Sequence, residues 1–148
     1  MDVVTCITRP AAVKESSVFL RVVIALQTLA LFAAPVTAGL LLTSPDGQVL
    51  HSASAYTVFA VAVLHLLAAI LAWRPGGGPP GPILYAAGFL GLVLVQVALG
   101  IAQLKTLHVP LGVLLFGLSV LALSRVPAGR RISVASGGPA VREPDAMP

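Results

Sequence analysis

The sequence predicts an all-α membrane protein: an antiparallel bundle of four transmembrane helices with both termini in the cytoplasm. The 148 residues are 57% hydrophobic and only 9% charged, whereas a soluble domain carries about 25% charged residues. The apolar residues gather into four runs, each close to the roughly 20 residues that cross a bilayer as a helix. Lipid offers the backbone no hydrogen-bond partners, so these runs must be helical. The basic residues, finally, cluster at one end of the predicted bundle.

Short polar segments separate the four runs, and together the runs form a predicted transmembrane domain over residues 18–124. Residues 1–17 are polar and predict a cytoplasmic N-terminal tail. Residues 125–148 are basic and then rich in Gly, Pro and Ser, which predicts a disordered cytoplasmic C-terminal tail. The expected spans are 18–42, 51–73, 83–104 and 107–124, with a TSPDG turn at 43–47 and the loop RPGGGPPGP at 74–82.

The distribution of positive charge predicts the orientation of the bundle. Cytoplasmic loops of membrane proteins carry an excess of Lys and Arg. With both termini inside, only Lys105 and Asp46 would face the opposite side. We therefore interpret the net charge of +4 as a topology signal and expect no nucleic-acid binding, since no basic patch interleaves with aromatic residues. The inside set comprises Arg9, Lys14, Arg21, Arg74, Arg125, Arg130 and Arg131.

A rival interpretation makes residues 1–38 a cleavable signal peptide. A charged leader, an apolar stretch and the small-residue sequence Val36-Thr37-Ala38 fit that pattern. Cleavage would leave three helices and would still place the basic C-terminal tail inside. The apolar run continues through residues 39–42, however, and the charged leader is long, so we favour four spans.

Two histidines occupy matching positions: His51 opens the second run and His108 opens the fourth. Both would lie at the outer ends of helices that can sit side by side. Ala55 and Gly112 follow them by four residues on the same helix faces, which leaves room for a flat macrocycle. Neutral imidazoles on facing helices commonly hold a haem iron. We hypothesise that His51 and His108 ligate one haem, the alternative being two interfacial histidines without function.

Other polar residues inside the spans suggest secondary roles. His65 follows His51 by fourteen residues, on nearly the same face and about 21 Å deeper. It has no histidine partner at that depth, so we expect a polar contact between helices. Contact with a propionate or a quinone, and ligation through a partner subunit, remain alternatives. Gln96 is a second candidate for an interhelical hydrogen bond.

Three segments together are similar to one four-helix half of the haem A synthase family. They are VLHSA at 49–53, LVQVALG at 94–100 and TLHVPLG at 106–112. The family joins two such halves, each with a histidine at the outer end of its second and fourth helices. The similarity covers roughly residues 20–124 and implies a bis-histidine haem b held by His51 and His108 near the outer face.

The chain also departs from that family. Where the family's catalytic half has a glutamate three residues before its first histidine, this chain has Gln48. The second half and the extracellular cysteine pair of many members are missing. We therefore expect a haem b protein for electron transfer or haem handling rather than an enzyme. The alternatives are a cofactor-free accessory subunit of a larger membrane complex and, less favoured, a haem-modifying enzyme acting as a dimer.

The expected partners are the lipid bilayer and either a second copy of the chain or a larger respiratory or haem-handling complex. The abundance of Ala, Gly, Leu and Val indicates a bacterial plasma membrane.

Overall fold

A computed structural model describes residues 9–74 and 80–126, with side chains from residue 18 onward. This part of the chain consists of helices and short turns and contains no strand. The all-helical prediction is confirmed, with four helices in the described residues. Their bounds are α1 (Arg9–Leu40), α2 (Gly47–Trp73), α3 (Gly81–Ile101) and α4 (Lys105–Arg125).

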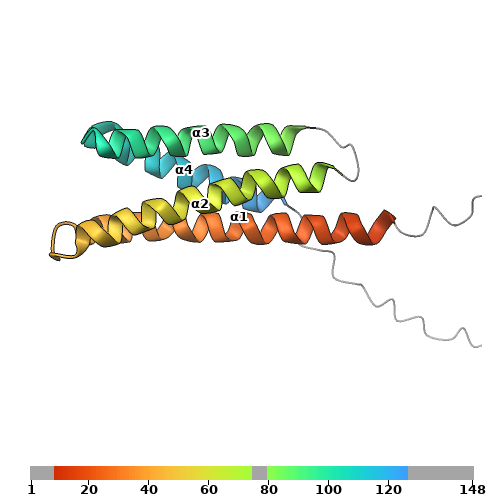
Figure 1. Cartoon of the computed structure of the whole chain (residues 1–148), viewed down its shortest axis with the longest axis horizontal. Coiled ribbons are helices and arrows are strands. Elements are labelled where there is room, and N and C mark those ends of the chain that lie inside the picture. Colours follow the sequence, from red (N-terminus) through yellow and green to blue (C-terminus); the bar gives the residue numbers. More distant parts are fainter. Residues whose placement is uncertain (1–8, 75–79, 127–148) are drawn as a thin grey trace, which may run out of the picture.

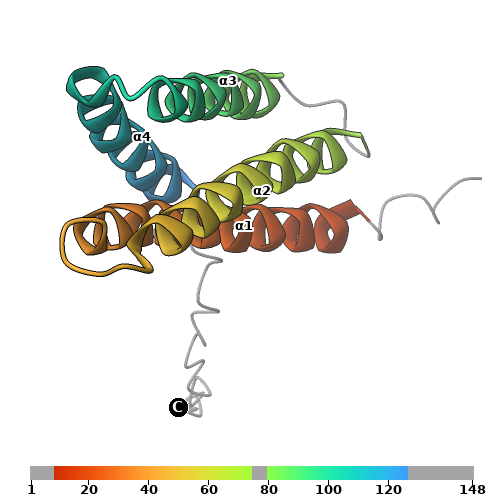
Figure 2. The same ribbon diagram turned by 60° about the vertical axis from the view of Figure 1, so that its left-hand side comes forward.

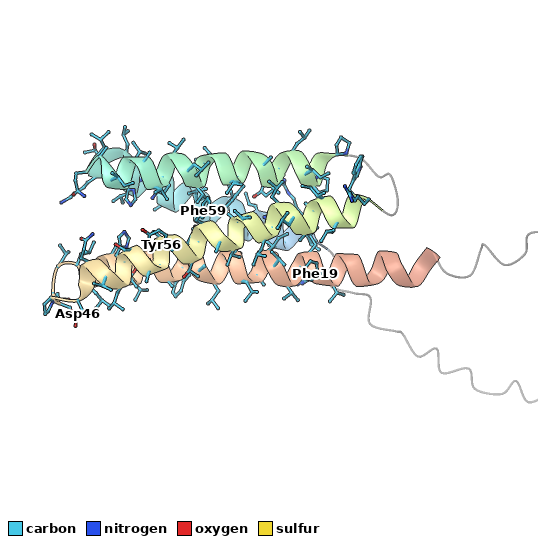
Figure 3. The ribbon with its side chains drawn as sticks, in the orientation of Figure 1. Phe19, Asp46, Tyr56 and Phe59 are labelled. Atoms are coloured by element: carbon cyan, nitrogen blue, oxygen red, sulfur yellow. The ribbon has the colours of Figure 1, made fainter. Side chains whose placement is uncertain are left out.

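All four helices are long and apolar enough to cross a membrane, with Val18–Leu40 as the apolar part of α1. Large apolar side chains cover the outside of the bundle. Phe19, Tyr56 and Phe59 are 53%, 76% and 38% exposed, and Figure 3 shows them on the surface of α1 and α2. A soluble protein rarely exposes so much contiguous apolar surface. The chain is therefore a multi-pass membrane protein.

The helices pack in a ring in which α1 and α3 each contact α2 and α4 (Figures 1 and 2). Helices α2 and α4 therefore face each other across the ring. The turn between α1 and α2 and the turn between α3 and α4 lie at the same end of the molecule, at the left in Figure 1. We call this end the turn end. The C-terminus of α2 and the N-terminus of α3 lie at the opposite end.

The turn between α1 and α2 is tight because Gly47 has no side chain. Gly47 is buried, and a Cβ atom there would overlap the backbone of Leu40 and Leu41. The Ser44 backbone N–H donates to the Leu40 carbonyl at 2.9 Å, which closes the end of α1. The chain reverses in six residues, and the start of α2 lies against the last turns of α1.

The turn between α3 and α4 is a Schellman motif. The Leu104 N–H donates to the Leu99 carbonyl at 3.0 Å and the Gln103 N–H to the Gly100 carbonyl at 3.1 Å. This pattern needs a left-handed residue after the helix, which is usually glycine. Gln103 takes that place with φ 57°. The turn returns the chain to α3, so the start of α4 packs against the end of α3.

The observed helix ends differ from the expected ones in several places. Helix α1 begins at Arg9, so the second half of the expected tail at 1–17 is helical. Helix α2 begins at Gly47, and α4 begins at Lys105, which places His51 and His108 within the first turns of their helices. Residues 127–148, most of the expected disordered tail, lie outside the described residues.

The core combines small and branched side chains. Ala62 and Phe89 from the middle of α2 and α3 are 1% and 3% exposed, and Leu115 of α4 is fully buried. Small residues on α2 let the helix axes approach closely, as helices in membranes commonly do. The apolar cluster consists of Leu31, Val58, Ala62, Phe89, Val93 and Leu115.

Candidate functional site

His51 and His108 meet at the turn end of the bundle. Their ring centroids lie 6.3 Å apart and their planes are inclined by 73°. One ring comes from α2 and the other from α4, the helices that face each other across the ring of four. Both residues are half-buried. The structure thus brings together the two side chains that the sequence singled out as a pair.

The spacing of the two rings suits a shared metal. A nitrogen-to-metal bond is about 2.0–2.1 Å, and with roughly 1.1 Å from each nitrogen to its ring centre, two collinear imidazoles on one metal have centroids about 6.3 Å apart. The same distance also falls within the range for a direct edge-to-face contact of two rings, about 4.5–7 Å. Distance alone therefore admits both a ligand pair and a packing contact.

His108 is held rigidly by α3. Its Nδ1 lies 2.9 Å from the backbone oxygen of Gln96, and the Gln96 side-chain amide donates to the His108 carbonyl at 2.8 Å. Because a carbonyl can only accept, Nδ1 carries the proton and the lone pair is on Nε2. A Cβ atom at Gly100 would lie 3.0 Å from the ring carbon Cε1 of His108. The absence of a side chain at Gly100 therefore makes room for the ring.

His51 is held by side-chain hydroxyls. Its Nδ1 lies 3.3 Å from the Thr37 hydroxyl, which donates its proton to the Ala34 carbonyl at 2.9 Å and lies 2.9 Å from the Ser54 hydroxyl. The Ser54 hydroxyl in turn donates to the His51 carbonyl at 2.7 Å. The Nδ1 atom of His51, like that of His108, thus faces a protein oxygen. Metal-bound histidines usually have their second ring nitrogen engaged in this way.

Gln96 contributes an acceptor that has no donor among the described residues. Its Oε1 is buried and makes no hydrogen bond within that part of the chain, while its Nε2 donates to the His108 carbonyl. Flipping the amide would place two oxygens against each other, so the Gln96 amide orientation is determined. A buried acceptor without a donor calls for a water molecule or a bound group. Gln96, a secondary candidate in the sequence, therefore belongs to the site.

Ala55 and Gly112, the small residues that the sequence suggested would leave room for a macrocycle, have different surroundings. A Cβ atom at Gly112 would lie 3.0 Å from Nε2 of Gln96, so Gly112 makes room for that side chain rather than for a ligand. Ala55 is half-buried. Sequence reasoning missed Gly100 and Thr37 as neighbours of the histidines. The spacing of Gln96 and Gly100, four residues apart on one face of α3, was the available signal for Gly100.

His65 belongs to a separate polar cluster deeper in the bundle. Its Nδ1 lies 3.0 Å from Oε1 of Gln27, whose Nε2 donates to the Ser119 hydroxyl at 3.4 Å. Thr28 contacts the same hydroxyl at 2.7 Å. Gln27 and Ser119 are completely buried, and His65 is 3% exposed. The cluster joins α1, α2 and α4, which confirms the expected polar contact between helices.

Tyr85 extends this cluster to α3. Its ring centroid lies 6.1 Å from that of His65, and its hydroxyl donates to the Leu118 carbonyl at 2.7 Å. Each of the four helices thus contributes a polar side chain at this level. Among the described residues, no group of three or more His, Cys, Asp or Glu side chains could hold a metal ion.

No protein-family model, curated protein or solved structure matches this chain. Its function has to be inferred from the His51–His108 pair and the residues around it.

Proposed function

We propose that this chain is a membrane haem b-binding protein in which His51 and His108 are the two axial ligands. The observation that carries the proposal is the ring spacing of 6.3 Å, combined with a protein oxygen facing Nδ1 of each ring. That arrangement leaves Nε2 of both side chains to act as metal ligands. The resemblance of this chain to half of a haem A synthase points to the same two residues.

Three features of the residues around the pair fit such a group. Both donors are imidazole side chains, and imidazole is a common haem ligand. Gly100 makes room for the His108 ring, which a larger residue would displace. The buried Oε1 of Gln96 offers a bound group an acceptor that no donor in the described part of the chain uses.

The chain would hold and insulate the cofactor rather than transform a substrate. A bound haem supplies one-electron exchange between Fe(III) and Fe(II). If both His51 and His108 bound the iron, oxygen would have no coordination position, which favours electron transfer or haem handling. Gln48 is exposed in the first turn of α2 and is an amide, so it supplies no carboxylate for the chemistry of haem A synthases.

The proposed topology is an antiparallel bundle with both termini inside. Arg74 caps the C-terminus of α2 and Arg125 ends α4, while Arg21 donates to the Val126 carbonyl at 2.7 Å. Asp46 and Lys105 mark the turn end, and Figure 3 shows Asp46 there. By the positive-inside rule the three arginines face the cytoplasm. The histidine pair then lies near the outer face of a bacterial plasma membrane.

An absorption spectrum of the full chain, purified in detergent from a haem-replete host, tests the proposal. We expect reduced-minus-oxidised bands of haem b in the wild type and none in the double variant His51→Ala/His108→Ala. The matched control is His65→Gln, which removes the third histidine but keeps a hydrogen-bonding side chain, and it should retain the bands. A wild-type protein without haem bands would contradict the proposal.

A second candidate function is a cofactor-free subunit that packs in a larger membrane complex. It is favoured because the ring spacing also suits a direct edge-to-face contact. Ala87, Gly88 and Gly91 form an exposed small-residue face on α3 suited to close helix contact. In that case, the His51→Ala/His108→Ala variant would keep both the spectrum and the oligomeric state of the wild type.

A further inference from the structure

We infer that the end of the bundle opposite the turn end binds the headgroup of an anionic phospholipid, with the lipid phosphate held by Arg21 of α1 and Arg125 of α4. The ligand class is a phosphodiester on a lipid of net negative charge, and the occupant is a lipid of the adjacent leaflet. The inference makes no use of the histidine pair, so it stands or fails separately from the proposed haem site.

Arg21 is a charged residue within an apolar span. It follows shortly after Val18, where the apolar part of α1 begins, and it is half-buried. Charged side chains in membrane helices are costly and pair with an opposite charge or with backbone carbonyls. The guanidinium group of Arg21 donates from Nη1 to the Val126 carbonyl at 2.7 Å. This bond uses one of the five N–H donors of an arginine and leaves the positive charge without an anion.

Arg125 brings a second guanidinium group to the same place. It is the last residue of α4 and directly precedes Val126, whose carbonyl accepts from Arg21. Helices α1 and α4 pack against each other, and Arg125 is exposed. The hydrogen bond to Val126 thus fixes the Arg21 side chain beside the neighbour of Arg125 on the adjacent helix. We call these two residues the arginine pair.

No carboxylate among the described side chains neutralises the arginine pair. Asp46 is the single acidic residue within 18–74 and 80–126, and it lies at the turn end (Figure 3). The part of α1 between Arg21 and Leu40 alone spans about 28 Å. The counter-charge therefore comes from outside the described side chains. Basic sites between transmembrane helices bind the headgroups of anionic lipids, and the arginine pair lies at the level where those headgroups begin.

The surface beside the arginine pair favours a lipid over a free anion. Arginine binds phosphate through parallel N–H donors, and Arg21 has donors left for that contact. One helical turn further into the membrane, on the same helix faces as Arg21 and Arg125, Ala25 and Leu121 are exposed. A phospholipid whose phosphate is bound by the arginine pair can lay its acyl chains along these apolar side chains, whereas inorganic phosphate gains nothing from them.

The first test titrates the full chain in detergent with phosphatidylglycerol or phosphatidylcholine and measures the dissociation constant of the first bound lipid by native mass spectrometry. Each arginine near an anionic surface contributes about fivefold in affinity. We therefore expect the wild type to prefer phosphatidylglycerol by at least about fivefold, and Arg21→Gln and Arg125→Gln each to reduce that preference by about fivefold. Arg74→Gln is the matched control, because Arg74 is also exposed but caps α2, and it should keep the wild-type preference.

The second test measures thermal unfolding of the same proteins, because a ligand that binds only the folded chain raises its Tm. Phosphatidylglycerol should raise the Tm of the wild type and of Arg74→Gln, whereas phosphatidylcholine and inorganic phosphate should not. Arg125→Gln should lose this response while keeping the hydrogen bond between Arg21 and Val126, so that a loss of packing is not mistaken for a loss of binding.

Three results would overturn the inference. The first is a wild type that binds both lipids equally, as expected if a carboxylate outside the described side chains already pairs with the two arginines. The second is a loss of preference in Arg74→Gln as large as that in Arg125→Gln. The third is stabilisation by inorganic phosphate equal to that by phosphatidylglycerol. None of them affects the proposed haem site, whose test is the absorption spectrum.

Discussion

At the scale of single residues, the missing side chain of Gly100 determines where the His108 ring can lie. A Cβ atom there would stand 3.0 Å from Cε1 and 3.3 Å from Nδ1 of the ring. The ring cannot move away freely, because its Nδ1 is bonded to the Gln96 carbonyl. A side chain at position 100 would therefore compete directly with that hydrogen bond.

We predict that Gly100→Ala weakens the site although alanine is the better helix former. Exchanging Gly for Ala inside a helix stabilises the helix by about 1 kcal/mol through its propensity. We expect Gly100→Ala to lose at least that much stability, because the added Cβ atom displaces the His108 ring. Gly88→Ala is the control, since nothing lies within 4 Å of its added Cβ. Thermal unfolding in detergent and the haem spectrum measure the two effects. A Gly100→Ala variant as stable as Gly88→Ala, with an unchanged spectrum, would contradict this prediction.

At the scale of the elements, two short turns bring the four helices into contact. Gly47 allows α2 to start against the backbone of Leu40, and Gln103 ends α3 in the left-handed conformation. A side chain in that conformation costs roughly 1–2 kcal/mol. Gln103 is therefore a strained residue, and it lies in the turn that brings His108 of α4 back against Gln96 of α3.

We predict that Gln103→Gly stabilises the protein by about 1 kcal/mol, because glycine adopts a positive φ without steric cost. Gln103→Ala is the matched control: like the glycine variant, it loses the exposed side-chain bond from Nε2 to the Gly100 carbonyl at 3.0 Å, yet it keeps a Cβ atom. The difference in unfolding free energy between the two variants isolates the conformational term. The prediction fails if Gln103→Gly is no more stable than Gln103→Ala.

At the scale of the whole molecule, the polar side chains inside the bundle lie at two levels along its length. The turn end holds the histidine pair, and the deeper level holds the cluster of His65, Gln27 and Ser119. Hydrogen bonds between membrane helices contribute about 0.6–2 kcal/mol each. The deeper cluster therefore connects the helices, whereas at the turn end the Oε1 atom of Gln96 has no donor within residues 9–74 and 80–126.

We predict that the turn end faces outward. In a Cys6→Ser background, Thr43→Cys in the turn between α1 and α2 should react with a membrane-impermeant thiol reagent in intact bacterial cells that express the chain. Ser124→Cys, near the other end of α4, should react only after the cells are permeabilised. Both positions are exposed in the bundle, so a difference in labelling reports sidedness. The reverse labelling pattern would contradict the proposed orientation.

Prediction from sequence succeeded where the signal is local. Apolar runs of about 20 residues identified four helices because each backbone in lipid must satisfy its own hydrogen bonds. The apolar part of α1 begins at Val18, where the first run was expected to begin, while the helix itself also includes the polar residues from Arg9 onward, which hydropathy does not indicate. Sequence reasoning also paired His51 with His108 from their equivalent places in two runs. It could not identify Thr37 and Gly100 as their neighbours, because those contacts depend on helix rotation and on the geometry of two turns.

The sequence by itself determined that this is a helical membrane protein and which two histidines can share one end of it. Length, hydropathy and order along the chain are enough for that. Only the tertiary structure decided that the rings stand 6.3 Å apart, that a carbonyl faces one and a hydroxyl the other, and that His65 is bonded to Gln27. The physical reason is that hydropathy places a residue along the membrane normal, whereas packing between helices sets its rotation and its neighbours.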